Sequence, residues 1–188
     1  MAGFGVRKSA ATRCAVDFDI VDCASGRTGT PVRALLPAVL DLNGIAELRS
    51  LVGRELGTSG WHEIDQQRIT AFARATDDFE AIHIDHEHAV RAGLGSTIAH
   101  GLYVLSLGPK FLYEIYSLRE GPFGLNYGYE RVRFVAPVPV GSRIRMRATL
   151  SRADDISGGT KFTIEETFEI AGQDKPACAA TAVIAYFH

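Results

Sequence analysis

The 188-residue sequence has no apolar run that approaches the roughly 20 residues needed to span a bilayer. Its formal net charge of −2 gives no excess of positive charge for nucleic acid or an anionic membrane surface. The three cysteines are an odd number and form no C-x-x-C pair, so a disulfide framework is not expected. The N-terminus also lacks the apolar core of a secretory signal. These absences predict a cytoplasmic protein with neither membrane insertion nor a nucleic-acid partner.

Apolar residues make up 46% of the chain and charged residues 22%, which is typical of a soluble globular domain. Residues 1–30 are rich in Gly, Ser, Thr and Ala and have weak periodicity, which predicts a poorly ordered arm. Residues 31–52 have helix-like apolar spacing that Pro37 and Gly44 interrupt. We expect one or two short helices there.

A clearer helix follows in "IDQQRITAFARATDD". Asp65 can cap it, because a carboxylate accepts hydrogen bonds from the free N–H groups of a first turn. Ile69, Phe72 and Ala73 then lie on one face. The pattern predicts a helix that runs to about Thr76.

A second helix begins near His100 in "HGLYVLSLGPKFLYEIYSL". Its first half is apolar almost all round, which predicts burial on all sides. Pro109 removes a backbone donor and should bend this helix or end its buried part. We expect the second half to emerge toward solvent. The apolar residues of the first half are Leu102, Tyr103, Val104, Leu105 and Leu107. The residues that indicate an emerging second half are Tyr113, Glu114 and Tyr116.

After Gly121 the apolar period changes to two, over residues 124–138, 142–150, 160–170 and 177–187. This period predicts an antiparallel meander with one buried face, on which Glu166 is the polar exception. The simplest arrangement that buries the apolar surfaces of both elements wraps the sheet around the helix, giving an α+β fold. An edge strand would remain and favours a homodimer.

The segment "TDDFEAIHIDHEHA" (residues 76–89) concentrates histidines and carboxylates. If "HEHAVRAG" is a short helix capped by Asp85 and ended by Gly93, then His86 and His88 diverge by about 200°. There is no H-E-x-x-H motif, so we expect no metal site. The polar residues expected on the solvated first turn are His86, Glu87 and His88.

Asp78 and His83 are a candidate acid/base pair, because a loop folded between them could bring both to one water molecule. A local salt bridge is the alternative. "IAHG" follows, where the unpaired N–H groups of a helix start at Gly101 could stabilise an oxyanion. The alternatives are close helix–sheet packing for Gly101 and a hydrogen-bonded core histidine for His100.

"TDDFEAIHID" followed by "STIAHGLYVLSL" resembles the hydratase motif of the MaoC-like, (R)-specific enoyl-CoA hydratase family. The flanking "LVGRELGTSGWHEIDQQRITAFARATDD", "NYGYERVRFVAPVPVGSRIR" and "DKPACAATAVI" are most similar to its NodN-type, single-domain branch. The resemblance covers residues 43–188. It implies a hot-dog domain there, with residues 1–42 as an N-terminal arm that is partly disordered or helical.

The resemblance implies a long central helix inside an antiparallel sheet, a homodimer, and reversible syn hydration of a trans-2-enoyl thioester to a (3R)-3-hydroxyacyl thioester. Asp78 and His83 take the catalytic positions, with His83 as base and Asp78 as proton donor to Cα. The Gly101 amide would polarise the thioester carbonyl. Ser106 and His100 are candidates for orienting the substrate.

The family implies no cofactor, since coenzyme A or an acyl carrier protein belongs to the substrate. Arg131 and Arg133 are candidates for the coenzyme A phosphates. Many members carry Asn-Pro where this chain has Glu80-Ala81, which puts the substrate range in question. Two other functions stay open: an acyl-CoA thioesterase of the same fold, and a non-catalytic acyl-binding partner subunit.

Overall fold

The computed structural model describes residues 39–119 and 123–187. Its strands are β1 (Leu40–Leu42), β2 (Glu55–Thr58), β3 (His62–Glu63), β4 (Tyr116–Leu118), β5 (Gly124–Phe134), β6 (Arg143–Ile156), β7 (Gly159–Ile170) and β8 (Cys178–Phe187). Its helices are α1 (Ile45–Arg49), α2 (Gln66–Thr76), α3 (Ala81–Ile84), α4 (His86–Arg91), α5 (Gly101–Ser106) and α6 (Gly108–Ile115). The expected arm lies largely outside the described residues.

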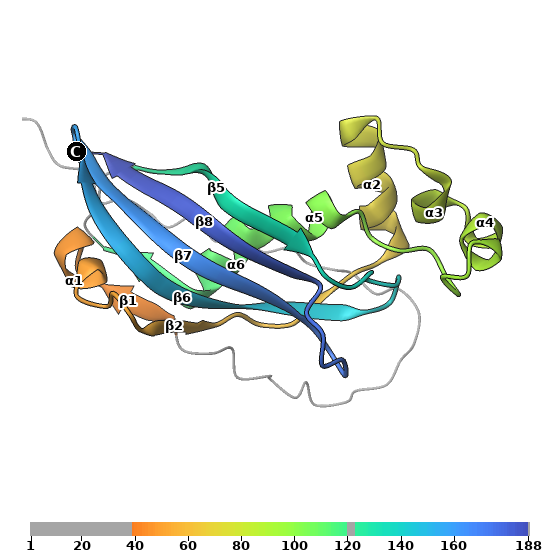
Figure 1. Ribbon diagram of the computed structural model, residues 1–188, viewed down its shortest axis with the longest axis horizontal. Helices are drawn as coiled ribbons and strands as arrows, with labels where there is room; N and C mark the ends of the chain where they lie inside the picture. Colours follow the sequence, from red (N-terminus) through yellow and green to blue (C-terminus); the bar gives the residue numbers. More distant parts are fainter. Residues whose placement is uncertain (1–38, 120–122, 188) are drawn as a thin grey trace, which may run out of the picture. The chain divides into compact units, whose positions relative to one another are not determined.

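The main sheet is antiparallel in the strand order β2-β6-β7-β8-β5, with β3 also pairing with β6. The expected meander is confirmed for β6, β7 and β8, whereas β5 crosses over to pair with β8. α5 and α6 run along one face of this curved sheet (Figure 1). The predicted α+β architecture, an antiparallel sheet around a central helix, is therefore confirmed.

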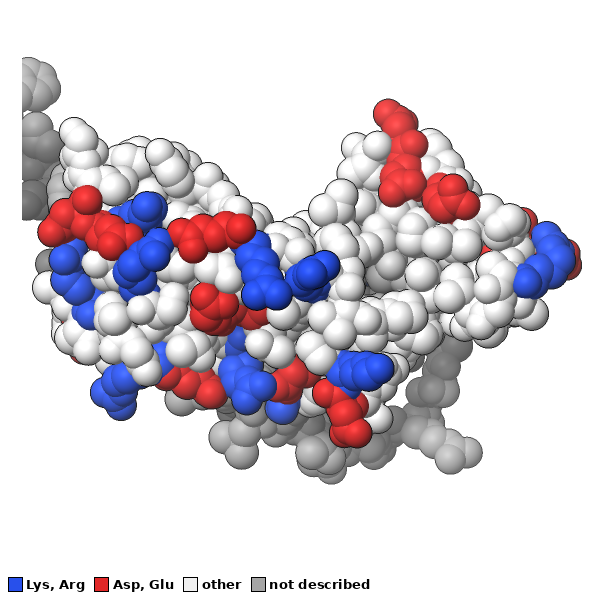
Figure 2. Space-filling model, in the orientation of Figure 1, with Lys and Arg blue, Asp and Glu red and all other residues white. Residues whose placement is uncertain are grey.

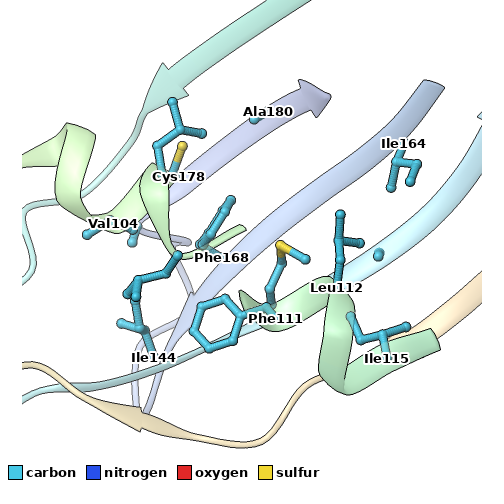
Figure 3. Packing of buried hydrophobic residues seen from close by; sticks show 14 of the residues in the cluster. Val104, Phe111, Leu112, Ile115, Ile144, Ile164, Phe168, Cys178 and Ala180 are labelled. Carbon is cyan, nitrogen blue, oxygen red and sulfur yellow. The ribbon is translucent and has the colours of Figure 1, made fainter. Parts of the chain in front are cut away.

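The core lies between this helix pair and the inner face of the sheet. Phe111 is fully buried, and Figure 3 shows it among side chains from α6 and from the strands. The period-two pattern of β7 places Phe162, Ile164 and Phe168 inside, all with no exposed surface. Glu166 lies on the same inward face and is only 2% exposed, so the polar exception in the sequence pattern is a buried carboxyl.

The central helix is interrupted at Leu107, because α5 ends at Ser106 and α6 begins at Gly108 with Pro109 in its first turn. Proline is tolerated there because the first N–H groups of a helix have no partner in the helix. The helix is thus interrupted close to Pro109, but its burial does not end there. Phe111, Leu112 and Ile115 are at most 5% exposed.

Two expectations for this helix pair were wrong. Tyr116 does not emerge into solvent: it is 6% exposed, lies in β4, and its hydroxyl shares a 2.9 Å hydrogen bond with that of Tyr186. Leu102 is 60% exposed and not buried as expected, although it sits in an apolar run. The all-round apolar pattern therefore includes a position that stays exposed among the described residues.

Residues 40–42 pack against the core, although the family resemblance starts at residue 43. Leu40–Leu42 pair in parallel with Tyr116–Leu118, and Leu42 is 2% exposed in the core. The strand β1 replaces part of the helix expected over residues 31–52, and α1 follows it from Ile45. The local sequence cannot reveal this strand, because its backbone partners lie in β4.

Acidic and basic side chains alternate over the face drawn in Figure 2 and do not form a patch of one sign. Arg145 and Arg147 on β6 both pair with Glu169 on β7, at 2.8 and 3.2 Å. These arginines of β6 therefore lie on a solvated, ion-paired face of the sheet. Among the described residues, no helix is long and apolar enough to cross a membrane. Cys178 is a buried free thiol, whereas Cys14 and Cys23 lie outside the described part.

Candidate active site

Local capping brings the chain into the site. The Asp65 side chain accepts a hydrogen bond from the Arg68 N–H at 2.7 Å and starts α2, as predicted. Asp77 ends α2 with φ 56°, a left-handed conformation in which Asp is among the better tolerated residues. This turn places Asp78 immediately beyond the helix. The Asp85 side chain accepts from the His88 N–H at 3.0 Å and starts α4, also as predicted.

His83 lies on α3 and is 8% exposed. Its Nδ1 donates a 2.8 Å hydrogen bond to the Ile98 carbonyl, which can only accept. Nδ1 therefore carries the proton in the neutral ring, and Nε2 presents a lone pair. Within the described residues no hydrogen bond engages Nε2. His83 thus has the tautomer that a general base requires.

Two polar side chains that sequence reasoning missed fix the backbone around His83. The Gln66 side-chain amide donates to the His83 carbonyl at 2.9 Å, and Thr97 donates its hydroxyl to Gln66 Oε1 at 2.6 Å. The Ile98 N–H donates to the Ile82 carbonyl at 3.2 Å. Both ends of the Gln66 amide are therefore used, which fixes its orientation and ties α2 to α3.

His100 stacks on His83, with ring centroids 3.8 Å apart and an interplanar angle of 27°. It is 2% exposed, and its Nε2 donates to the Asp78 carbonyl at 3.1 Å. Its Nδ1 is buried with no hydrogen-bond partner among the described residues. Burial lowers the pKa of His100, and the adjacent His83 lowers it further, against the opposing effect of the bond to Asp78. The structure therefore favours a neutral His100 that holds the backbone of Asp78.

Asp78, His83 and His100 each place one ligand atom within 4.8 Å of the others. Asp78 Oδ1 accepts a 3.4 Å hydrogen bond from the Glu80 N–H, and Asp78 Oδ2 lies 4.0 Å from His100 Nε2. These distances allow the Asp78 carboxylate and the His83 imidazole to contact one water molecule. His83 Nδ1 and His100 Nε2 already bond backbone carbonyls, so one nitrogen of each ring remains for a ligand.

Gly101 is the first residue of α5, and its N–H forms no hydrogen bond within the described residues. A Cβ at this position would lie 2.9 Å from the Phe134 ring, so a side chain here would displace that ring. A cavity of about 260 Å³ lies beside it and is lined by His83, Gly101, Val104 and Phe134 among others. The free N–H and the imidazole thus border one cavity.

The other predicted residues lie farther out. The Ser106 hydroxyl donates to the Tyr103 carbonyl in its own helix at 2.7 Å, and its side chain lies on the exposed face. No contact brings Ser106 to Asp78 or His83 within the described residues. Arg131 and Arg133 lie on the edge strand β5, exposed and without an ion pair to other described residues. The predicted surface residues His86, Glu87 and His88 are exposed.

Residues 47–170 match the family model described as MaoC like domain. The chain belongs to the MaoC-like family. It is 40% identical to 3-hydroxyacyl-thioester dehydratase Z of Mycobacterium tuberculosis, over 76% of this chain and 95% of that protein. It is 42% identical to Nodulation protein N of Rhizobium leguminosarum bv. viciae, over 72% of this chain and 86% of that protein.

Two solved structures have the same fold as this MaoC-like chain. One is the (R)-hydratase from A. caviae involved in PHA biosynthesis, with a TM-score of 0.58 at 21% identity, covering 71% of this chain and 94% of that one. The other is the ChsH1-ChsH2 complex of Mycobacterium tuberculosis, with a TM-score of 0.60 at 20% identity, covering 73% and 98%. These likenesses confirm the hot-dog fold that the motifs indicated.

Proposed function

We propose that this MaoC-like chain catalyses the reversible syn hydration of a trans-2-enoyl thioester to a (3R)-3-hydroxyacyl thioester. The observation that carries the proposal is the fixed tautomer of His83 beside the Asp78 carboxylate. Nδ1 donates to the Ile98 carbonyl, which leaves Nε2 as a proton acceptor. The dehydratase name of its Mycobacterium tuberculosis relative supports the same reaction class.

In the hydration direction, His83 Nε2 accepts a proton from water as the water oxygen forms its bond to Cβ. Asp78, which this step requires as the protonated carboxylic acid, donates its proton to Cα as the C=C π bond breaks. The proton then returns from His83 to Asp78, so the pair is restored and the sum is one added water. The Gly101 N–H stabilises the enolate oxygen that develops on the thioester carbonyl. Dehydration follows the same steps in reverse.

The test is hydration of crotonyl-CoA by the purified full chain, followed as loss of the near-ultraviolet absorbance of the conjugated enoyl thioester. His83→Ala and Asp78→Asn should each lower kcat/KM by roughly 10²-fold or more, which is the usual magnitude for general acid/base catalysis. His86→Ala is the matched control, because this exposed histidine lies three residues away and contacts nothing in the site. We expect it to retain wild-type activity.

Full activity in both site variants would refute the assignment. Release of free thiol from an acyl-CoA, blocked by the same two substitutions and without hydration, would instead identify a thioesterase. If neither reaction occurs but acyl-CoA binds, the chain is an acyl-binding subunit.

The substrate's carrier is proposed to be coenzyme A or acyl carrier protein, with no further cofactor. Arg131 and Arg133 are two positions apart on β5 and therefore share a face of that strand. Both guanidinium groups are free to meet phosphate, because no other described residue forms an ion pair with them. Arg131→Ala and Arg133→Ala should raise KM for crotonyl-CoA more than they lower kcat.

A second copy of the chain is proposed to cover the exposed face formed by β5 and α5–α6. β5 is an 11-residue edge strand, and long unprotected edges pair readily with another strand. Large apolar side chains are exposed on this face: Leu102, Tyr113, Leu125, Tyr127 and Phe134. A homodimer would remove them from water.

Sedimentation equilibrium of the full chain tests this interface. Tyr127→Lys, which places a charge on the β5 edge, should shift the protein from dimer to monomer. Val90→Lys is the control, because Val90 is 46% exposed on α4 and does not belong to this face. A monomeric wild type, or a Tyr127→Lys variant that stays dimeric, would contradict the proposal.

A further inference from the structure

A second cavity, of about 400 Å³, lies at the α6 end of the helix pair. α6, β4, the first half of β5, the last half of β8, and β7 enclose it. Its lining is mostly apolar and aromatic. Among the lining residues are Leu112, Tyr116, Tyr129, Glu166, Ile184 and Tyr186.

Glu166 is a buried polar residue in the mostly apolar lining of this cavity. The residue is 2% exposed, and its Oε2 is buried with no hydrogen-bond partner among the described residues. An unpaired carboxyl in such a place is costly, and native proteins rarely retain one without a reason. Glu166 therefore points to a partner outside the described residues.

The backbone makes room for this carboxyl. A Cβ added at Gly108 would lie 3.3 Å from Glu166 Oε2, tighter than an ordinary contact, and 3.5 Å from Oε1, at ordinary contact distance. Gly108 is also where the central helix restarts, so the carboxyl lies against the junction of α5 and α6. The site is thus built from both the strand and the helix.

The groups around Glu166 are uncharged donors and acceptors. The hydroxyls of Tyr116 and Tyr186 already bond each other at 2.9 Å, and burial raises the pKa of both tyrosines. Burial raises the pKa of Tyr129, and raises that of the Cys178 thiol to about 11. With no cation against it among the described residues, burial raises the pKa of Glu166 to about 8. At neutral pH its carboxyl is therefore mainly protonated and able to donate.

This cavity and the one at His83 lie along the same helix pair. The cavity at His83 is bounded by Gly101 and Val104 of α5, the end of β5 and the start of β8. The second cavity is bounded by α6 and the opposite halves of the same two strands. Gly108 is seven positions after Gly101, which corresponds to roughly 10 Å at the helical rise of 1.5 Å per residue.

We propose that Glu166 is a specificity-determining residue, which selects an acyl chain carrying a hydroxyl or keto oxygen roughly 10 Å from the thioester carbonyl. This inference rests on the proposed function, because it takes the thioester carbonyl to lie at Gly101. An oxygen at that depth gives the carboxyl its missing hydrogen bond. A plain alkyl chain would fill the cavity and leave Oε2 without a partner.

The test compares trans-2-decenoyl-CoA with its analogue bearing a hydroxyl on the terminal carbon, each referred to crotonyl-CoA on the same preparation. The wild type should favour the hydroxylated chain by about tenfold in kcat/KM, the effect of one unmade buried hydrogen bond. Glu166→Gln keeps a neutral donor and acceptor of the same shape and should keep this preference. Glu166→Leu should favour the alkyl chain instead.

The outcomes separate the two proposals. A wild type that does not hydrate crotonyl-CoA overturns the proposed function and this inference with it. A wild type that hydrates crotonyl-CoA but favours the alkyl chain overturns this inference alone, whether or not the variants fold. An equal preference in wild type and Glu166→Leu, with circular dichroism showing both folded, also overturns it.

Discussion

The two ends of the α5–α6 helix pair differ in how their polar groups are held. At the α5 end, backbone carbonyls fix the imidazoles: His83 donates to Ile98 and His100 donates to Asp78. At the α6 end, Glu166 is equally buried, but its carboxyl has no partner among the described residues. The polar groups at the α5 end are held in place by hydrogen bonds, whereas the carboxyl at the α6 end has none within the described residues.

This difference fits two separate roles along one helix pair, proton transfer and selection among acyl chains. Proton transfer requires groups already in place, because a small displacement of a base lowers the rate steeply. Selection among acyl chains instead requires a group whose energy depends on what arrives. In the two proposals above, the α5 end serves proton transfer and the α6 end serves selection of the acyl chain.

The largest predicted effect is a fall in the free energy of unfolding as pH rises, caused by ionisation of the buried Glu166 carboxyl. Its pKa is about 8 in the folded chain against 4.5 for the unperturbed group, so the folded state binds more protons between these values. That contribution is complete below pH 4.5 and is lost as pH rises through 8, on the order of 5 kcal/mol in all. Urea unfolding at pH 5, 7 and 9 measures it.

Glu166→Gln is the control, because its amide does not titrate. The difference in unfolding free energy between variant and wild type should move in the variant's favour as pH rises from 5 to about 8, and should then level off. A difference that stays constant from pH 5 to 9 would mean that the carboxyl is not the buried, unpaired group described above.

The next effect concerns the support of His83 at the α5 end. Gln66→Leu removes the donor to the His83 carbonyl and the acceptor for Thr97, leaving buried polar groups unpaired. We expect a loss of about 1–3 kcal/mol in stability and about tenfold in kcat with crotonyl-CoA. Denaturant unfolding and steady-state kinetics measure the two losses.

Gln66→Glu separates the two bonds, because a carboxylate still accepts from Thr97 but cannot donate to the His83 carbonyl. Its kcat should therefore fall almost as far as that of Gln66→Leu. Wild-type kcat in both variants would show that Gln66 supports the fold without positioning the base.

A smaller pH effect of opposite sign is expected at the α5 end. The pKa of His100 is lowered by burial, so the folded chain binds fewer protons than the unfolded chain below pH 6.5. The stability it contributes is present above 6.5 and is lost as pH falls toward the folded pKa. An NMR titration of the imidazole should give a midpoint below 6.5. A midpoint at or above 6.5 would show that the bond to Asp78 outweighs burial.

The predictable parts of the molecule are those that local sequence controls. Asp65 and Asp85 start their helices as expected, because a cap bonds to residues three positions away. The alternation in β6 and β7 gave the strands and their buried faces, including Glu166 as the exception. The two residues expected to do chemistry, Asp78 and His83, are brought together across a short loop.

The parts that were not predicted depend on long-range contacts. The Gln66 amide meets His83 across 17 positions, with no motif to mark the pair. Tyr116 is buried because β4 pairs with β1, more than 70 residues earlier. Leu102 is exposed although it lies in an apolar run, because an apolar pattern does not show which of its residues the rest of the fold covers.

The smallest effects compare one glycine at each end. At Gly101 a Cβ would lie 2.9 Å from the Phe134 ring, and at Gly108 it would lie 3.3 Å from Glu166 Oε2. In both places alanine favours the helix by about 0.5–1 kcal/mol, which offsets part of the crowding. We expect each alanine variant to stay within about 1 kcal/mol of wild-type stability, measured by urea unfolding.

Their activities should nevertheless diverge. Phe134 is half exposed and can swing away from a new methyl group, but it lines the cavity beside His83. Gly101→Ala should therefore lower kcat/KM for crotonyl-CoA by about tenfold, since a shift of the reacting groups is costly. Gly108→Ala crowds only the distant carboxyl and should affect the ten-carbon substrates more than crotonyl-CoA. Equal losses on crotonyl-CoA in both variants would mean that the two ends of the helix pair are coupled and do not work separately.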